Sequence, residues 1–209
     1  MKYLIPIFLL SIMANAQNTD FLTPYENGNG NQTATYEETI AYFQLLDKNF
    51  ETISMQEMGL TDSGEPLHII TYNSDKEFDF EKIQKDKAVL LINNGIHPGE
   101  PDGIDATMML FRDLALGKIK IPKHLAIVAI PIYNIGGALN RNSFSRANQN
   151  GPESYGFRGN ASRCSTERRL RLTPSILHFE ISTIYAVYTS AFQTSQRWTI
   201  RGLLALTLD

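Results

Sequence analysis

The chain has 209 residues, a formal net charge of −3 and 43% hydrophobic residues, a composition that suits one ordinary globular domain. This slightly acidic balance provides no basic surplus for binding nucleic acid. No apolar run reaches the roughly 18 residues that a transmembrane helix needs. A single cysteine, Cys164, excludes both an intramolecular disulfide and a cluster of thiolate zinc ligands.

Residues 1–16 have the pattern of a secretory signal peptide. Lys2 precedes a short apolar run from Tyr3 to Met13, and Ala14-Asn15-Ala16 has the small-x-small pattern of a cleavage site. We therefore expect cleavage after Ala16 and a secreted or periplasmic location. A buried N-terminal helix is the alternative for the same apolar run.

The first part of the expected mature chain contains a helix followed by a hairpin. Residues 17–34 are rich in Asn, Gly and Thr and predict a loose lead-in. Thr35-Tyr36-Glu37-Glu38 is a capping box, which predicts that a helix begins there. Ile53 to Met58 and Leu67 to Tyr72 have the composition of two strands, and the turn residues Thr61 to Gly64 between them predict a hairpin.

The next part contains the pattern of a parallel α/β sheet. The charged stretch Asp75 to Lys87 predicts a solvated connection. Ala88 to Ile96 and Leu125 to Tyr133 are nearly continuous apolar runs, typical of strands buried on both faces. Pro101 to Leu116 between them has helical periodicity and is followed by Gly117, which can end a helix. Together with the hairpin, this order predicts an α/β fold with a mixed, largely parallel sheet and flanking helices.

The end of the first apolar strand has the residues of a metal site. His97 leaves the strand, Pro98-Gly99 turns the chain, and Glu100 begins the helix. An imidazole and a carboxylate at this spacing can meet one metal ion, and a distant third histidine would complete a zinc site with an open position for water. The spacing alone leaves an alternative open, in which Glu100 only interacts favourably with the helix dipole.

Two motifs carry a resemblance to a known family. Asn-Gly-Ile-His-Pro-Gly-Glu at residues 94–100 and Ile-Pro-Ile-Tyr-Asn-Ile-Gly-Gly at residues 130–137 resemble the zinc carboxypeptidases, the carboxypeptidase A-like metallopeptidases. The resemblance covers about residues 35–160. It implies that His97 and Glu100 are zinc ligands, that Zn²⁺ is the cofactor, and that the substrate is the C-terminus of a peptide or protein, whose last peptide bond is hydrolysed.

The resemblance also implies an arginine that stabilises the oxyanion after the second strand. Arg146 and Arg141 are both candidates for this catalytic role, because a guanidinium has a fixed charge and forked donors. The third zinc ligand stays open. His178, in an apolar setting, is one candidate, whereas His68 and His124 are expected to be structural.

The family pattern stops near residue 160. The substrate-clamping motif expected there is absent from residues 161–209, which contain no Asn and no Lys but include the only Cys and the only Trp. Residues 1–160 carry 13 Lys and Arg against 19 Asp and Glu, whereas residues 161–209 carry six against three. We interpret residues 161–209 as an atypical tail that does not match the family pattern. We hypothesise that the reading frame shifts near residue 161, which sequencing the gene would test.

Three functions are therefore compatible with the sequence. The first is a secreted zinc-dependent carboxypeptidase, incomplete at its C-terminus and weakly active or inactive as written. The second is a zinc-dependent deacylase or amidase that has the same pair of ligands and a different substrate. The third is a secreted, non-catalytic binding module with the same fold.

Overall fold

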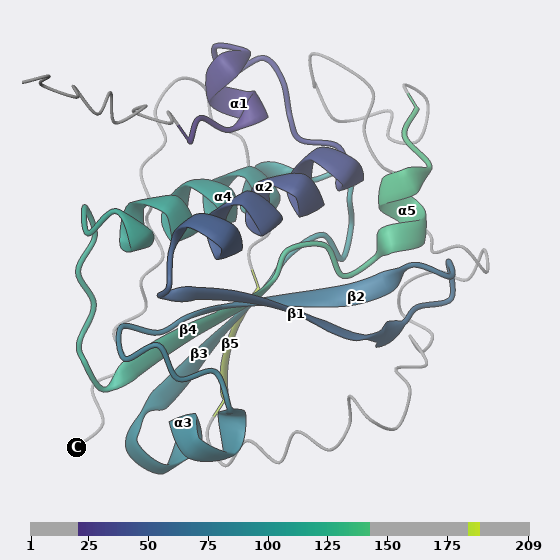
Figure 1. Cartoon of the computed structure of the whole chain (residues 1–209). Helices are drawn as coiled ribbons and strands as arrows, with labels where there is room; N and C mark the ends of the chain where they lie inside the picture. The colour runs from purple at the N-terminus through teal and green to yellow at the C-terminus, as the bar shows by residue number, and fades with distance from the viewer. Residues whose placement is uncertain (1–20, 143–183, 189–209) are drawn as a thin grey trace, which may run out of the picture.

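The computed structural model describes residues 21–142 and a strand at residues 184–188 (Figure 1). The expected signal peptide, Arg146, Cys164 and His178 lie outside the described residues. The helices are α1 (Pro24–Asn27), α2 (Tyr36–Asn49), α3 (Phe80–Asp86), α4 (Asp102–Ala115) and α5 (Ile135–Leu139). The strands are β1 (Ile53–Leu60), β2 (Pro66–Tyr72), β3 (Ala88–Asn93), β4 (Leu125–Ile130) and β5 (Ile184–Tyr188).

The described strands form one mixed sheet in the order β1-β2-β4-β3-β5. The β1–β2 hairpin and the β2–β4 pair are antiparallel, whereas β3 pairs in parallel with both β4 and β5. The predicted α/β fold with a mixed sheet and flanking helices is confirmed. The parallel share is smaller than expected, because the hairpin joins the sheet through β2 and adds two antiparallel pairings. Strand β5 lies within the tail that the sequence analysis describes as atypical.

Helix α2 begins at the predicted capping box. The Thr35 hydroxyl accepts a hydrogen bond from the Glu38 backbone N–H at 3.1 Å, and the Glu38 carboxylate accepts one from the Thr35 backbone N–H at 2.8 Å. Two N–H groups that have no partner inside the helix are thereby satisfied, which fixes the first turn.

The larger hydrophobic core lies between the sheet and the helix pair α2 and α4, which run side by side over one face (Figure 1). The rings of Phe43 on α2 and Phe111 on α4 are completely buried and meet edge to face, with centroids 5.8 Å apart. Full burial of such a side chain contributes about 1.5–3 kcal/mol to stability. This packing fixes α4, and therefore its N-terminal end, relative to the sheet.

Helix α3 packs against the opposite face of the sheet, in the segment where the sequence predicted a solvated connection (Figure 1). That prediction is wrong in part, because Asp79 caps a short helix and Ile83 packs against Val89 and Val128. Ile83 is the one buried residue of α3, and the residues around it are mostly charged. A single buried residue gives no helical periodicity in the sequence, so the helix was not predicted.

Residues 21–34, the described part of the segment predicted as a loose lead-in (17–34), contain α1. Thr23 is completely buried and caps this helix, because its hydroxyl accepts a hydrogen bond from the Glu26 backbone N–H at 3.3 Å. A four-residue helix cannot be stable alone, so tertiary contacts must hold it in place.

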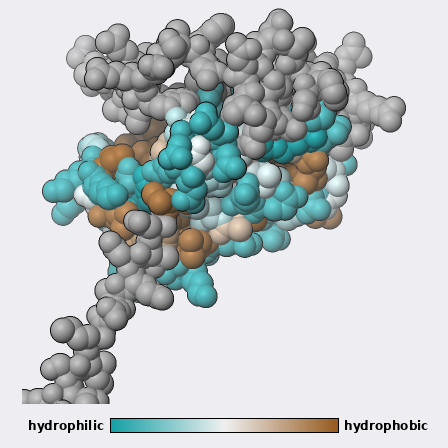
Figure 2. Space-filling model, turned by 90° about the horizontal axis from the view of Figure 1, so that it is seen from above, coloured by the Kyte–Doolittle hydropathy of each residue, from teal (hydrophilic) through white to brown (hydrophobic). Residues whose placement is uncertain are grey.

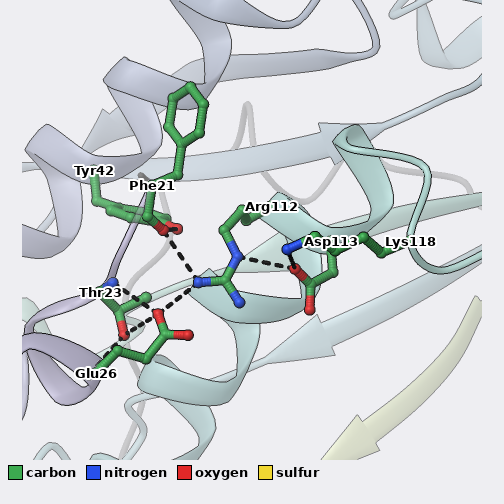
Figure 3. A network of polar contacts seen from close by, with 7 residues as sticks. All are labelled: Phe21, Thr23, Glu26, Tyr42, Arg112, Asp113 and Lys118. Atoms are coloured by element: carbon green, nitrogen blue, oxygen red, sulfur yellow. Dashed lines mark hydrogen bonds and ion pairs between the residues drawn. The ribbon is translucent and has the colours of Figure 1, made fainter. Parts of the chain in front are cut away.

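Those contacts centre on Arg112 of α4 (Figure 3). One nitrogen of its guanidinium donates to the Glu26 carboxylate at 2.5 Å and to the Phe21 carbonyl at 3.1 Å, and Nε donates to Asp113 at 2.9 Å. The Tyr42 hydroxyl donates to the same Phe21 carbonyl at 2.8 Å. Burial opposes the charge, but the carboxylates of Asp113 and Glu26 outweigh it and raise the pKa of Arg112. The network binds the N-terminal segment to α4.

The visible surface over the helices mixes hydrophilic residues with separate hydrophobic ones (Figure 2). The large hydrophobic side chains that are exposed among the described residues are scattered over different elements: Leu22, Leu45, Leu60, Leu116 and Leu139. Among the residues that the structure describes, no helix is long and apolar enough to cross a membrane.

Candidate functional site

The candidate site lies where β3 and β4 end, at the same edge of the sheet. Both strands end earlier than predicted. The Asn94 backbone N–H still donates to the Ile130 carbonyl at 3.0 Å, but Pro131 has no N–H with which to continue the ladder of β4. Two further backbone bonds, from Tyr133 to Asn94 and from Asn134 to the Gly95 carbonyl, each 2.9 Å long, join the loops that follow. The loop that carries His97 is therefore attached to the loop after β4.

Gly95 is required at the point where these two loops meet. Its φ is +63°, in the left-handed region that favours glycine, and a Cβ there would lie 3.0 Å from the Ile132 Cα. The glycine of the motif thus allows both the turn and the close approach of the two backbones.

His97 and Glu100 are brought together by the turn between β3 and α4. The Glu100 backbone N–H donates to the His97 carbonyl at 2.8 Å, which closes the Pro98-Gly99 turn. The His97 Nδ1 lies 3.7 Å from the Glu100 Oε2, and the side chains are 24% and 22% exposed. Both polar ends are therefore adjacent to each other and accessible from solvent.

This distance fits two ligands of one zinc ion. Nitrogen and oxygen ligands lie at about 2.0–2.2 Å from zinc, so in tetrahedral geometry they are separated by about 3.3–3.5 Å. The observed 3.7 Å needs only a few tenths of an ångström of closure. Imidazole nitrogen and carboxylate oxygen are also ligand types that zinc accepts.

A third ligand is not found among the described residues, where no group of three His, Cys, Asp or Glu side chains could hold a metal ion. His68, expected to be structural, is buried in β2 with its Nε2 3.8 Å from a Glu57 carboxylate oxygen. His124 is exposed just before β4. Its backbone carbonyl accepts a hydrogen bond from Ala88 at 2.8 Å. His178 lies outside the described residues.

The first turn of α4, which follows Glu100, adds the carboxyl groups of Asp102 and Asp105. Burial, followed by the negative charge of Glu100, raises the pKa of Asp102. Burial likewise raises the pKa of Asp105 to about 6, although hydrogen bonds from Thr33 and Ala34 oppose the shift. The first turn of α4 therefore carries a half-buried Asp102 and a buried Asp105.

Arg141 holds the chain before α2. Its Nη1 donates to the Ala34 carbonyl at 2.9 Å, while the Ala34 backbone N–H donates to Asp105 Oδ1 at 3.2 Å. Ala34 is thus held through both its backbone N–H and its carbonyl, and Asp105 connects it to the first turn of α4. The proposed oxyanion role of Arg141 is not tested by this contact, and Arg146 lies outside the described residues.

Sequence reasoning missed a second contact beside the site, between Asn94 and Thr107. The Asn94 side-chain amide donates to the Thr107 hydroxyl at 2.6 Å, and both residues are buried. A signal was present, because Thr107 occupies the same helical stripe as Ile104, Met108 and Phe111. A hydroxyl on an otherwise apolar stripe predicts a buried partner.

Comparisons with known proteins support the fold. No protein-family model and no curated protein matches the chain. Bovine thrombin-activatable fibrinolysis inhibitor, solved in complex with tick carboxypeptidase inhibitor, matches 76% of this chain with a TM-score of 0.51 and 15% identity. Carboxypeptidase A from Helicoverpa armigera matches 53% with a TM-score of 0.46 and 20% identity. A metallo-carboxypeptidase from Burkholderia cenocepacia matches 69% with a TM-score of 0.48 and 19% identity.

The described part of the chain therefore has a carboxypeptidase-like fold. The match covers 60% of the bovine chain, 26% of the Helicoverpa chain and 36% of the Burkholderia chain. The chain thus matches less than two thirds of the length of each of these proteins.

Proposed function

We propose that this chain carries the first two ligands of a zinc site of the carboxypeptidase type, in a protein that acts outside the cytoplasm on the C-terminal peptide bonds of peptides or proteins. The observation that carries the proposal is the 3.7 Å approach of His97 Nδ1 to Glu100 Oε2 at the carboxyl ends of two parallel strands. In open α/β sheets, that edge is where ligands bind. The fold shared with solved carboxypeptidases supports the same assignment.

Bound zinc would supply Lewis acidity, which polarises a carbonyl and lowers the pKa of a coordinated water. The residues of this chain would hold the ion and leave it accessible. His97 offers a nitrogen lone pair and Glu100 an anionic oxygen, so the pair compensates only one of the two positive charges. Exposure of about a quarter of each side chain leaves room for a substrate to approach.

The oxyanion role belongs to Arg141 or Arg146 in this proposal. Either guanidinium would donate hydrogen bonds to the carbonyl oxygen as negative charge develops on it. Arg141 is the one that the structure describes, and its Nη1 bond to Ala34 would orient the group rather than neutralise its charge. Substitution of each arginine by lysine separates the two assignments, because lysine keeps the charge and loses the forked donors.

Zinc titration tests the site directly. We expect isothermal calorimetry to detect 1:1 binding by the wild type at pH 7.5, and either His97→Ala or Glu100→Gln to weaken it by at least about tenfold, as loss of a ligand should. His124→Ala is the matched control, because it removes an exposed histidine from the loop before β4. Equal zinc affinity in all four proteins would refute the proposed site. Tight binding by the wild type would indicate a third ligand, such as His178.

Peptidase activity is a separate test. Because residues 161–209 lack the expected substrate clamp, we expect little or no hydrolysis of a blocked dipeptide with a free C-terminal carboxylate. Clear turnover that Glu100→Gln abolishes would contradict this expectation while supporting the zinc site. Export of a fusion to residues 1–16 into the periplasm or medium would test the proposed location.

A further inference from the structure

The buried bond between Asn94 and Thr107 joins residues on either side of the turn that carries the candidate zinc ligands. Its length is 2.6 Å, and the two residues are only 2% and 3% exposed. Asn94 follows the last residue of β3, and Thr107 lies in the second turn of α4. The bond therefore joins the strand that leads to His97 with the helix that follows Glu100.

The backbone of Asn94 is also held by two hydrogen bonds. Its backbone N–H donates to the Ile130 carbonyl at 3.0 Å, and its carbonyl accepts from the Tyr133 N–H at 2.9 Å. The backbone of Asn94 is thus attached to β4 and the loop after it, while the side chain reaches α4. The turn that contains His97 and Glu100 lies between β3 and α4, and Asn94 connects these two elements.

We propose that Asn94 and Thr107 are positioning residues that hold the turn in the conformation in which His97 and Glu100 share a metal ion. This inference rests on the proposed function. Residues 95–101 form a loop without regular structure. The Glu100 N–H donates to the His97 carbonyl within the loop, and Asn134 donates to the Gly95 and Ile96 carbonyls at its start. Fixing the two ends of such a loop reduces the conformations available to it, so less entropy is lost when both ligands bind one ion.

Substitutions at Thr107 isolate the hydroxyl. Thr107→Val keeps the branched shape and removes the hydroxyl that accepts the hydrogen bond from the Asn94 amide. Thr107→Ser keeps the hydroxyl and should retain the bond. Thr39→Val is the matched control, because the Thr39 hydroxyl is also completely buried and donates to the Thr35 carbonyl at 2.7 Å, on α2.

Amide hydrogen exchange of the metal-free protein measures the turn without zinc. The probe is the Glu100 N–H, which donates to the His97 carbonyl. We expect Thr107→Val to speed its exchange by about tenfold, the equivalent of one lost buried hydrogen bond. Thr107→Ser and Thr39→Val should leave the rate within about twofold of wild type. An unchanged Glu100 rate in a folded Thr107→Val protein would overturn the positioning role.

Zinc affinity then tests the consequence for the metal. We expect Thr107→Val to raise the dissociation constant for Zn²⁺ by about tenfold, with Thr107→Ser and Thr39→Val close to wild type. If the wild type binds zinc through His97 and Glu100 and Thr107→Val binds equally well, this inference is wrong and the proposed function stands. If the wild type binds no zinc, the proposed function is wrong and the inference about the metal falls with it.

Discussion

Asp105 should make the protein less stable at neutral pH than at acidic pH. Asp105 is 5% exposed, and burial raises the pKa of its carboxyl group from 3.8 to about 6 despite hydrogen bonds from Thr33 and Ala34. Below the pKa of the unfolded chain, the group is protonated in both states. Between pH 3.8 and about 6, only the unfolded state loses the proton, so stability falls as the pH rises. Above that window, the folded state carries the full cost of a buried charge.

Asp105→Asn tests this reasoning. An asparagine keeps an oxygen that can accept from the Ala34 N–H and has no proton to lose. Each pKa unit corresponds to about 1.36 kcal/mol, so a shift of this size is equivalent to at most about 3 kcal/mol. We expect the substitution to raise the free energy of unfolding by about 1–3 kcal/mol at pH 8, and to change it little at pH 4.

Urea unfolding followed by far-ultraviolet circular dichroism, with EDTA present, measures the difference at the two pH values. Glu37→Gln, at an exposed position of α2, shows how much of the effect the loss of any carboxylate produces. Equal effects of Asp105→Asn at pH 4 and pH 8, or destabilisation at pH 8, would refute the argument. Destabilisation at pH 8 would mean that attraction to Arg141 outweighs the cost of burying the charge.

Three further substitutions test the packing of the fold and the turn. Phe111→Ala should lower the free energy of unfolding by about 3–5 kcal/mol in urea denaturation, because it empties a fully buried ring position; a loss below about 1 kcal/mol would contradict the core assignment. Thr71→Val should raise stability by about 1 kcal/mol, because the buried hydroxyl has no hydrogen-bond partner among the described residues; clear destabilisation would reveal a partner. Gly95→Ala should cost more stability than Gly64→Ala in the same assay. Both positions have positive φ, but only at Gly95 would a Cβ press on another backbone, that of Ile132. Equal losses would show that the close approach does not matter.

The predictions that the structure confirms were made from signals that neighbouring residues form together in the sequence. Helix α2 begins at the capping box of Thr35 and Glu38. Gly117, whose φ is +70°, follows the C-terminal end of α4. The apolar runs became the adjacent parallel strands β3 and β4. Such signals are read within a few positions, because capping, turn conformation and strand burial depend on local residue types.

The candidate site was only partly visible in the sequence. The spacing of His97 and Glu100 allowed a shared ion, and the structure places their polar atoms 3.7 Å apart. Hydrogen bonds join Ala34 to Asp105, which lies 71 positions later in the chain, and to Arg141, which lies 107 positions later. No local sequence pattern indicates either bond. Their separation along the chain shows why propensity and periodicity cannot predict such a contact.

The sequence by itself determined where α2 and α4 begin, which runs become buried strands, and that an imidazole and a carboxylate flank a proline-glycine turn. Only the tertiary structure decided that β2 lies beside β4, that the segment before α2 is anchored by Arg112, and that Thr107 accepts a hydrogen bond from Asn94. These features depend on which distant surfaces pack together. That choice is made by burial and by hydrogen bonds satisfied across the whole fold, and not by the residues next to each position in the chain.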